Sequence, residues 1–266
     1  EVVENISVEV NVSAKPITFL IEDIADVTYN GLAHTPVVVV KDGETTLTKD
    51  ADYTISYSDN INAGIASVTV TGKGNYAGNN GIKTFEIHRA NVNNRNNDKT
   101  ITYSGQTYDV SQLFIIDSNA GSPTYTLEQG GTGEGVLEGN MLTITKVGSI
   151  AIGMTTEQTE NYNKSDKVIA NLTVNKATKE ASAGIAKLNV SAKGGNDGKI
   201  LNVSTDMEYK RADGEYKGIS GNEITGLEKG EYYIRFKETE FYQASLDKLI
   251  IIDEHAVIRI DETVPQ

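Results

Sequence analysis

An internal repeat is the feature that most constrains the fold of this chain. In each copy a glycine opens a stretch of alternating apolar and polar residues, and after a polar loop comes a doublet that ends in tyrosine. The glycines are Gly64, Gly148 and Gly230, and the tyrosines are Tyr76, Tyr162 and Tyr242. These tyrosines follow one another at intervals of 86 and 80 residues. The interval fits a small β-sandwich and is too long for a solenoid repeat, so the sequence predicts three domains.

The local patterns predict β-strands. Alternation with a period of two occurs at 67–71, 141–145 and 232–236, and each repeat closes with a further strand at 83–87, 169–174 or 247–251. Turn-forming residues separate these stretches, at 41–44, 58–60, 196–198 and 212–214. Helical periodicity is almost absent. The best candidate, 179–187, is interrupted by Gly184 and is predicted to be a linker or one loose turn.

Two matching signatures place the domain boundaries. A basic residue followed by alanine ends the last strand of the first and second copies, at Arg89-Ala90 and Lys176-Ala177. Ala14-Lys15-Pro16 is similar to these junctions. We therefore predict domains at 15–90, 91–176 and 177–266, with residues 1–14 as a leading strand or a linker from a preceding module. The expected fold class is all-β, with three consecutive β-sandwich domains in an elongated arrangement.

Composition and charge exclude several classes of protein. The 266 residues carry a net charge of −13 and contain no cysteine, so disulfide and thiolate chemistry are excluded. The acidic residues are spread along the chain, and this balance argues against a protein that tracks nucleic-acid phosphates. No run approaches the length of a membrane span, so we expect no membrane insertion in this segment. The first residue is Glu1, and no signal-peptide pattern follows it, as expected for a mature protein or an excised fragment.

Parts of the sequence resemble known modules. The segments concerned are 51–58, 62–64 and 72–76 in the first copy, 102–108 and 125–133 in the second, and 224–235 in the third. Through these segments the first copy resembles the bacterial Ig-like repeats of large modular surface proteins, and the second is similar to a related module of the same proteins. The third looks like the fibronectin-type or Ig-like units that often follow. The resemblance implies three consecutive Ig-like or fibronectin-type β-sandwich domains and an extracellular, cell-surface or cell-wall location, and it specifies no activity.

We predict no catalytic, cofactor-binding or metal-ligating residue and no cofactor. The histidines, His34, His88 and His255, have no second histidine or cysteine at ligand spacing, and we expect His88 and His255 to be exposed. The glycine-rich run 130–135 lacks the basic residue and the following helix of a phosphate loop, and is predicted to be a flexible β-hairpin loop. Two alternatives stay open: calcium at Asp253-Glu254 or in the 58–60 turn, and a Lys-to-Asn or Lys-to-Asp crosslink.

The tyrosines fall into two groups. Those at repeated positions are predicted to pack in the core or at strand ends, and those outside the repeat are the more open candidates for sugar recognition. The first group is Tyr53, Tyr57, Tyr76, Tyr162 and Tyr242, and the second is Tyr103, Tyr108, Tyr125 and Tyr216.

The sequence favours a non-enzymatic role. We expect a structural, spacer or adhesion module of a bacterial cell-surface or secreted protein. The alternative is a carbohydrate-binding or accessory segment of a larger extracellular enzyme. Expected partners are a host or matrix protein or a polysaccharide, with no nucleic acid, and we expect a monomer.

Overall fold

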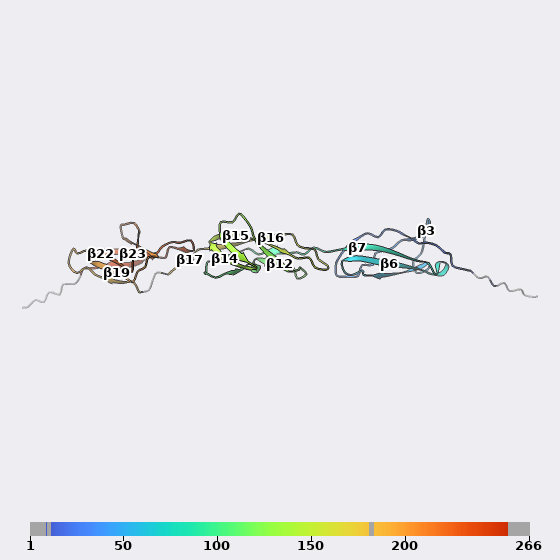
Figure 1. Cartoon of the computed structure of the whole chain (residues 1–266), viewed down its shortest axis with the longest axis horizontal. Coiled ribbons are helices and arrows are strands. Elements are labelled where there is room, and N and C mark those ends of the chain that lie inside the picture. The colour runs from blue at the N-terminus through green and yellow to red at the C-terminus, as the bar shows by residue number, and fades with distance from the viewer. Residues whose placement is uncertain (1–8, 10–11, 181–183, 255–266) are drawn as a thin grey trace, which may run out of the picture. The chain divides into compact units, whose positions relative to one another are not determined.

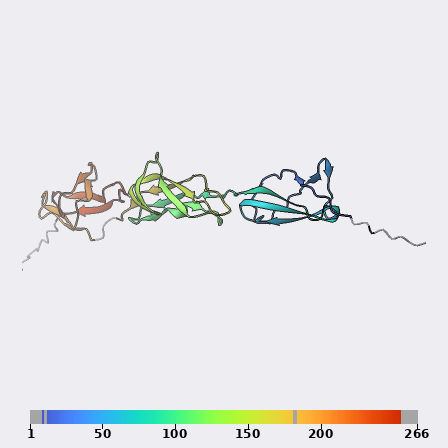
Figure 2. The same cartoon turned by 45° about the vertical axis from the view of Figure 1, so that its right-hand side comes forward.

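The computed structural model describes residue 9, residues 12–180 and residues 184–254. Regular structure within these ranges consists of β-strands and short 3₁₀ helices (Figure 1; a view turned by 45° is given in Figure 2). The chain divides into two compact units. The first unit consists of residues 1–96, 114–125 and 153–168, and the second of residues 97–113, 126–152 and 169–266. No helix among the described residues is long and apolar enough to cross a membrane.

Two sheets form the amino-terminal part of the first unit. One has the strand order β1, β3, β4, and the other has the order β2, β7, β6, β5. The strand bounds are Leu20–Ile21 for β1, Val27–Thr28 for β2, Val40–Asp42 for β3, Thr45–Thr46 for β4, Tyr53–Ser58 for β5, Gly64–Gly72 for β6 and Asn80–His88 for β7. β2 runs parallel to β7, whereas β6 is antiparallel to both β5 and β7. The helix η1 (Gly74–Tyr76) connects β6 to β7.

Apolar residues of the alternating strands form the core between these two sheets. Val68 and Val70 of β6 and Ile87 of β7 are buried on one side, and Val40 of β3 is buried on the other. All belong to one cluster, which also contains Phe19, Val38, Leu47, Tyr53, Ala66 and Phe85. Each large apolar side chain buried in this way stabilises the fold by about 1.5–3 kcal/mol relative to an exposed one.

The rest of the first unit contains short pairings. β8 (Arg95–Asn96) is antiparallel to β11 (Phe114–Ile115). Three longer strands, β12 (Pro123–Leu127), β15 (Gly148–Thr156) and β16 (Val168–Asn175), have residues in both units. With β9 (Lys99–Thr102) they form one sheet in the order β12, β15, β16, β9.

The second unit begins with a parallel pair and a small sheet. β9 runs parallel to β16, with Ile101 opposite Val174. A three-stranded sheet has the order β10 (Tyr108–Asp109), β14 (Met141–Lys146), β13 (Glu134–Glu138). The helix η2 (Val110–Leu113) follows β10 and buries Val110 and Leu113.

The carboxyl-terminal part of the second unit again has two sheets around one core. Their strand orders are β18, β19, β22 and β21, β20, β23, β25. The bounds are Ala186–Leu188 for β18, Gly198–Leu201 for β19, Met207–Arg211 for β20, Lys217–Gly218 for β21, Glu223–Leu227 for β22, Gly230–Phe236 for β23 and Lys248–Ile252 for β25. Ile200 and Ile224 from one sheet and Ile234 and Ile252 from the other lie in the same buried cluster. β17 (Ala177–Thr178) pairs in parallel with β24 (Tyr242–Gln243) outside these sheets.

The repeated glycines open strands, as predicted. β6, β15 and β23 begin at Gly64, Gly148 and Gly230, with φ angles of +139°, +132° and +159°. Residues with a side chain rarely adopt such angles, so glycine is required at each strand start. At Gly148 the space is also missing, because a Cβ would lie 2.6 Å from the nitrogen of Gly133.

Two sequence predictions need correction. The run 130–135 is not a hairpin loop, because β12 and β13 on either side of it belong to different sheets. Nor does it lie in open space, because a Cβ on Gly131 would be 2.2 Å from the carbonyl oxygen of Ser149. The last predicted strand begins at Lys248 rather than Asp247. Most of the predicted leading segment 1–14 lies outside the described residues, as does part of 179–187, and the domain boundaries stay predictions.

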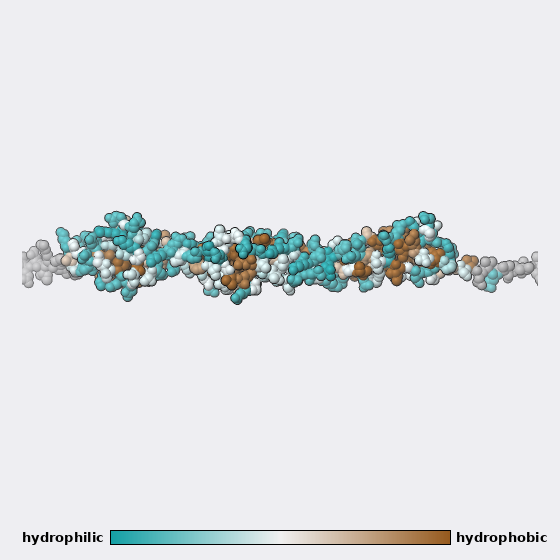
Figure 3. Space-filling model, turned by 45° about the horizontal axis from the view of Figure 1, so that its top comes forward, coloured by the Kyte–Doolittle hydropathy of each residue, from teal (hydrophilic) through white to brown (hydrophobic). Residues whose placement is uncertain are grey.

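The surface is mixed. Figure 3 shows a largely hydrophilic face with separate hydrophobic patches among the described residues. Large apolar side chains that stay exposed include Val37 and Leu246, with exposed fractions of 92% and 87%. Exposed apolar side chains are common on folded proteins, so we assign these no function.

Candidate functional site

Two places in the chain bring aromatic rings together in the same way, and the first lies within the first unit. β2 ends one residue before Tyr29, whose N–H donates to the carbonyl oxygen of His88 at 2.9 Å. The Tyr29 ring meets the Tyr162 ring edge to face, with centroids 5.5 Å apart. Beside them, the N–H of Ala90 donates to the carbonyl oxygen of Asn161 at 2.9 Å. We name Tyr29, Ala90, Asn161 and Tyr162 the first aromatic junction.

The second place lies within the second unit and repeats these contacts. The N–H of Tyr103 donates to the carbonyl oxygen of Asn175 at 2.9 Å. The Tyr103 ring stacks on Phe241 at 4.3 Å and meets Tyr242 edge to face at 5.9 Å. The N–H of Ala177 donates to the carbonyl oxygen of Phe241 at 2.9 Å. We name Tyr103, Ala177, Phe241 and Tyr242 the second aromatic junction.

The basic residue before each alanine binds the same loop. The Nε of Arg89 donates to the carbonyl oxygens of Thr159 at 3.2 Å and Glu160 at 3.1 Å. The Nζ of Lys176 donates to the carbonyl oxygen of Thr239 at 2.7 Å. The basic-alanine signatures therefore mark a pair of contacts, in which the side chain of one residue and the backbone N–H of the next bind the same loop.

Each of these loops is also held from within. The N–H of Thr159 donates to the carbonyl oxygen of Tyr162 at 3.0 Å, and the N–H of Tyr162 donates to the hydroxyl oxygen of Thr159 at 3.2 Å. Thr239 and Tyr242 exchange the same two bonds, at 2.9 and 3.1 Å. A threonine three residues before the tyrosine thus fixes the loop that presents the ring.

A third copy of the backbone contact occurs near the start of the described chain. The N–H of Lys15 donates to the carbonyl oxygen of Asn75 at 2.7 Å, as Ala90 and Ala177 do to their loops. The side chain of Asn79 accepts from the N–H of Ile17 at 3.0 Å and donates to the carbonyl oxygen of Lys15 at 2.8 Å. The chain therefore enters the first sandwich through the same backbone bond, in the segment whose sequence is similar to the two later junctions.

The tyrosines outside the repeat also contact protein groups. Tyr103 belongs to the second aromatic junction, and the Tyr125 ring lies 5.8 Å from the Phe114 ring. Tyr108 lies in β10, where burial raises the pKa of its hydroxyl and Asp109 raises it further.

Tyr216 is held by charged groups on the outer side of β20 and β23. Its O–H donates to a carboxylate oxygen of Asp247, the Arg235 guanidinium lies 3.6 Å from its ring centroid, and the Lys210 ammonium lies at 4.9 Å. The pKa of Tyr216 is raised to about 12, mainly by burial and also by the hydrogen bond to Asp247, while Arg235 partly opposes the rise. Two cationic groups lie over this ring, so it does not resemble an open sugar platform.

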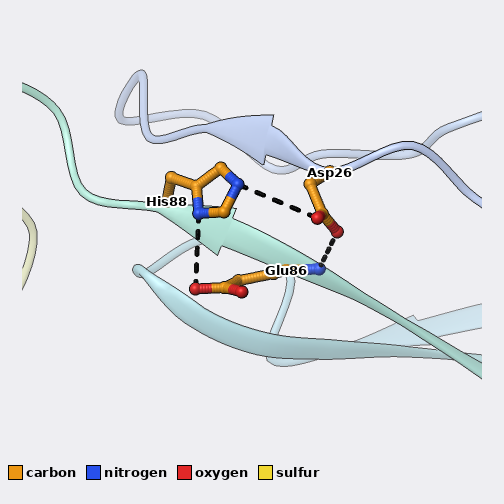
Figure 4. Close-up of side chains that lie close together, drawn as sticks. All are labelled: Asp26, Glu86 and His88. Atoms are coloured by element: carbon orange, nitrogen blue, oxygen red, sulfur yellow. Dashed lines mark hydrogen bonds and ion pairs between the residues drawn. The ribbon is translucent and has the colours of Figure 1, made fainter.

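A cluster of acidic side chains and a histidine lies at the end of β7 (Figure 4). His88 Nδ1 lies 3.3 Å from Glu86 Oε1, and His88 Nε2 lies 3.8 Å from Asp26 Oδ2. The N–H of Glu86 donates to Asp26 Oδ1 at 2.8 Å. We name Asp26, Glu86 and His88 the acidic-histidine cluster. His88 is 53% exposed, in agreement with the sequence prediction for it.

The turn named as a calcium candidate lines a hollow in the first unit. Asp59 lies there in a left-handed conformation, with φ of +55°, and Asn62 and Glu160 line the same hollow of about 420 Å³. Among the described residues, the one group of three converging metal-type ligands is the acidic-histidine cluster and not this turn. His34 lies beside the turn, where its N–H donates to the carbonyl oxygen of Asn60 at 2.8 Å. His255 lies outside the described residues.

Some members of these sites were predicted from the sequence and others were not. Repeated positions were predicted for Tyr162, Tyr242 and both basic-alanine pairs, whereas Tyr103 was assigned to the tyrosines outside the repeat. A signal for that residue was present, since a Thr-Tyr-x-Gly motif occurs at 28–31 and again at 102–105. The members of the acidic-histidine cluster were not connected, because Asp26 and Glu86 are 60 residues apart.

Two buried cores, each between two sheets, define an all-β protein of sandwich type, in agreement with the predicted fold class.

No protein-family model and no curated protein matches the chain. Similar solved structures include tandem Ig and fibronectin-type domains. "Sidekick-1 immunoglobulin domains 1-5" is 10% identical with a TM-score of 0.30, over 90% of this chain and 60% of that chain. The I9–I11 tandem from titin is 11% identical with a TM-score of 0.26, over 90% of this chain and 100% of that chain. The chicken CNTN1 FN1-FN3 domains are 10% identical with a TM-score of 0.21, over 88% of this chain and 97% of that chain. This chain thus spans less than two thirds of the Sidekick-1 fragment, and likeness at this level concerns the fold alone.

Proposed function

We propose that the chain is a non-enzymatic structural, spacer or adhesion segment of a bacterial cell-surface or secreted protein, built from small sandwich domains in tandem. The repetition of the aromatic junction carries this proposal. A catalytic site needs a single arrangement of reactive groups, whereas a tandem array needs the same contact wherever one domain follows another.

The chemistry of the junctions suits this role. Each combines a backbone hydrogen bond, an aromatic pair and a basic side chain that binds loop carbonyls. Aromatic pairs contribute about 0.5–1.5 kcal/mol beyond their buried area. Contacts of that size restrict motion at a short linker while permitting limited bending.

Nuclear magnetic relaxation of the full chain tests this role. In the Tyr162→Ala variant, residues 15–90 should tumble faster than in the unmodified chain, because the ring that meets Tyr29 is gone. Lys164→Ala is the matched control, since this exposed lysine lies two residues from the same tyrosine. Equal tumbling times in the unmodified chain and the Tyr162→Ala variant would contradict a structural role for the junction.

Location and ligand class need separate experiments. An antibody against the chain should label intact cells of the source organism or detect the protein in the medium. Labelling that appears only after the cells are made permeable would refute the surface or secreted location. A glycan array tests the carbohydrate-binding alternative, and specific retention of one polysaccharide would replace the spacer role with sugar recognition.

A further inference from the structure

The pairing of two strands assembles the acidic-histidine cluster. β2 is parallel to β7, with Val27 opposite Ile87. Asp26 immediately precedes β2 and therefore lies beside Glu86. Glu86 and His88 are two residues apart on β7, so their side chains leave the same face of the sheet. The hydrogen bond from the Glu86 N–H to Asp26 Oδ1 holds one carboxylate in place.

Charge in the cluster is incompletely balanced. Two acidic side chains nearby on the chain have lysine partners, because Glu22 pairs with Lys41 and Asp23 pairs with Lys83, each at 2.5 Å. Within the described ranges, no lysine or arginine forms an ion pair with Asp26 or Glu86, and the imidazole of His88 is their neighbour instead. A divalent cation there would neutralise both carboxylates without requiring a charged imidazole.

The donor set has the composition of a transition-metal site. One ligand atom from each of Asp26, Glu86 and His88 lies within 4.8 Å of the other two. A zinc ion takes one imidazole nitrogen and binds nitrogen and carboxylate oxygen at about 2.0–2.2 Å, so these side chains must rotate until both carboxylates face the same nitrogen of His88. Calcium and magnesium prefer oxygen ligands alone, which makes an imidazole donor a mark of zinc or a related metal.

Exposure of the cluster permits such a movement and gives an ion direct access. The side chains of Asp26 and Glu86 are each 50% exposed, and that of His88 is 53% exposed. We propose that Asp26, Glu86 and His88 bind one divalent transition-metal ion of the zinc class, with water in the remaining coordination positions. An open site with three protein ligands binds zinc more weakly than a closed site with four, so the bound ion should exchange readily with ions in solution.

Titration of the full chain with zinc chloride tests this proposal, by calorimetry and by the imidazole C–H resonances of His88. We expect one ion per chain, a shift of the His88 resonances, and little effect of equimolar calcium or magnesium. His88→Gln should weaken zinc binding on the order of tenfold or more, and Asp26→Asn and Glu86→Gln should also weaken it. Asp23→Asn is the matched control, because it removes an acid near the cluster that already pairs with Lys83.

Three results would overturn the proposal. They are zinc binding that leaves the His88 resonances unchanged, unchanged affinity in His88→Gln, and equal displacement of zinc by calcium. Melting curves of each variant in metal-free buffer separate loss of a ligand from loss of the fold. The three substituted side chains are about half-exposed, so we expect these curves to match that of the unmodified chain.

Discussion

We expect the stacking of Tyr103 on Phe241 to make a measurable contribution to the stability of the second unit. The rings are 4.3 Å apart with an interplanar angle of 22°, and both side chains are half-buried. Removing the Phe241 ring by Phe241→Ala loses the aromatic pair, about 0.5–1.5 kcal/mol. It also exposes apolar surface that is worth about 1 kcal/mol for a half-buried ring. We therefore expect the free energy of unfolding to fall by about 2 kcal/mol.

A double-mutant cycle isolates the contribution of the pair. The free energy of unfolding is measured for the unmodified chain, for Tyr103→Ala, for Phe241→Ala and for the double variant, by urea denaturation followed by circular dichroism. The transition that responds to Phe241→Ala is used throughout, because a chain with several cores need not unfold in one step. The coupling energy between the two substitutions should be about 0.5–1.5 kcal/mol.

Leu246→Ala is the matched control, because Leu246 lies in the same segment and is 87% exposed. It should change the free energy of unfolding by less than about 0.5 kcal/mol. Additive effects of Tyr103→Ala and Phe241→Ala, with a coupling energy near zero, would refute the stacking argument. So would a Phe241→Ala effect no larger than that of the control.

Two further predictions concern backbone strain and pH. Gly148→Ala should lower the melting temperature most, because its φ is strained and a Cβ would collide with the backbone of Gly133. Gly64→Ala should lower it less, because open space surrounds its strained φ of +139°. Gly221→Ala should leave it nearly unchanged, because Gly221 has an ordinary φ and open space around it. Equal melting temperatures for Gly148→Ala and Gly221→Ala would contradict this order. The pKa of Tyr216, raised to about 12, lies above its unfolded value of 10.0, so its contribution to stability is fully present below pH 10 and is lost as the pH rises through 12. Ultraviolet titration should show a tyrosine that ionises at this high pH. Tyr216→Phe should remove that ionisation, and Asp247→Asn should shift it to lower pH. If the same late ionisation persists in Tyr216→Phe, another group is responsible for it.

The sequence contained enough information for the strands and the repeat. A glycine before an alternating stretch predicts a strand start, and Gly64, Gly148 and Gly230 occupy such starts because their φ angles exclude side chains. The pairing of the strands was harder to predict from the sequence. β2 pairs in parallel with β7 although their residues are about 60 positions apart. A period-two pattern shows which side chains share one face of a strand, but it does not show which other strand lies beside it.

The same limit applies to the sites. Tyr162 and Tyr242 stood out because they repeat, whereas their partners Tyr29 and Tyr103 lie near the start of the preceding copy. The glycine-rich run was misread for a related reason. Its composition is typical of a flexible loop, but Gly131 is needed because the backbone of β15 passes too close for a side chain.

Parallel pairing of early and late strands has a consequence for mechanical load. β2 and β7 are parallel neighbours, β9 and β16 are as well, and Val190 forms a parallel bridge with Glu254. If tension is applied through the chain on both sides of such a pair, the early strand is pulled from its start and the late strand from its end. The two strands then slide along each other, and their hydrogen bonds bear the force together instead of breaking one at a time. The pairing geometry therefore opposes extension even though the parallel pairs are short.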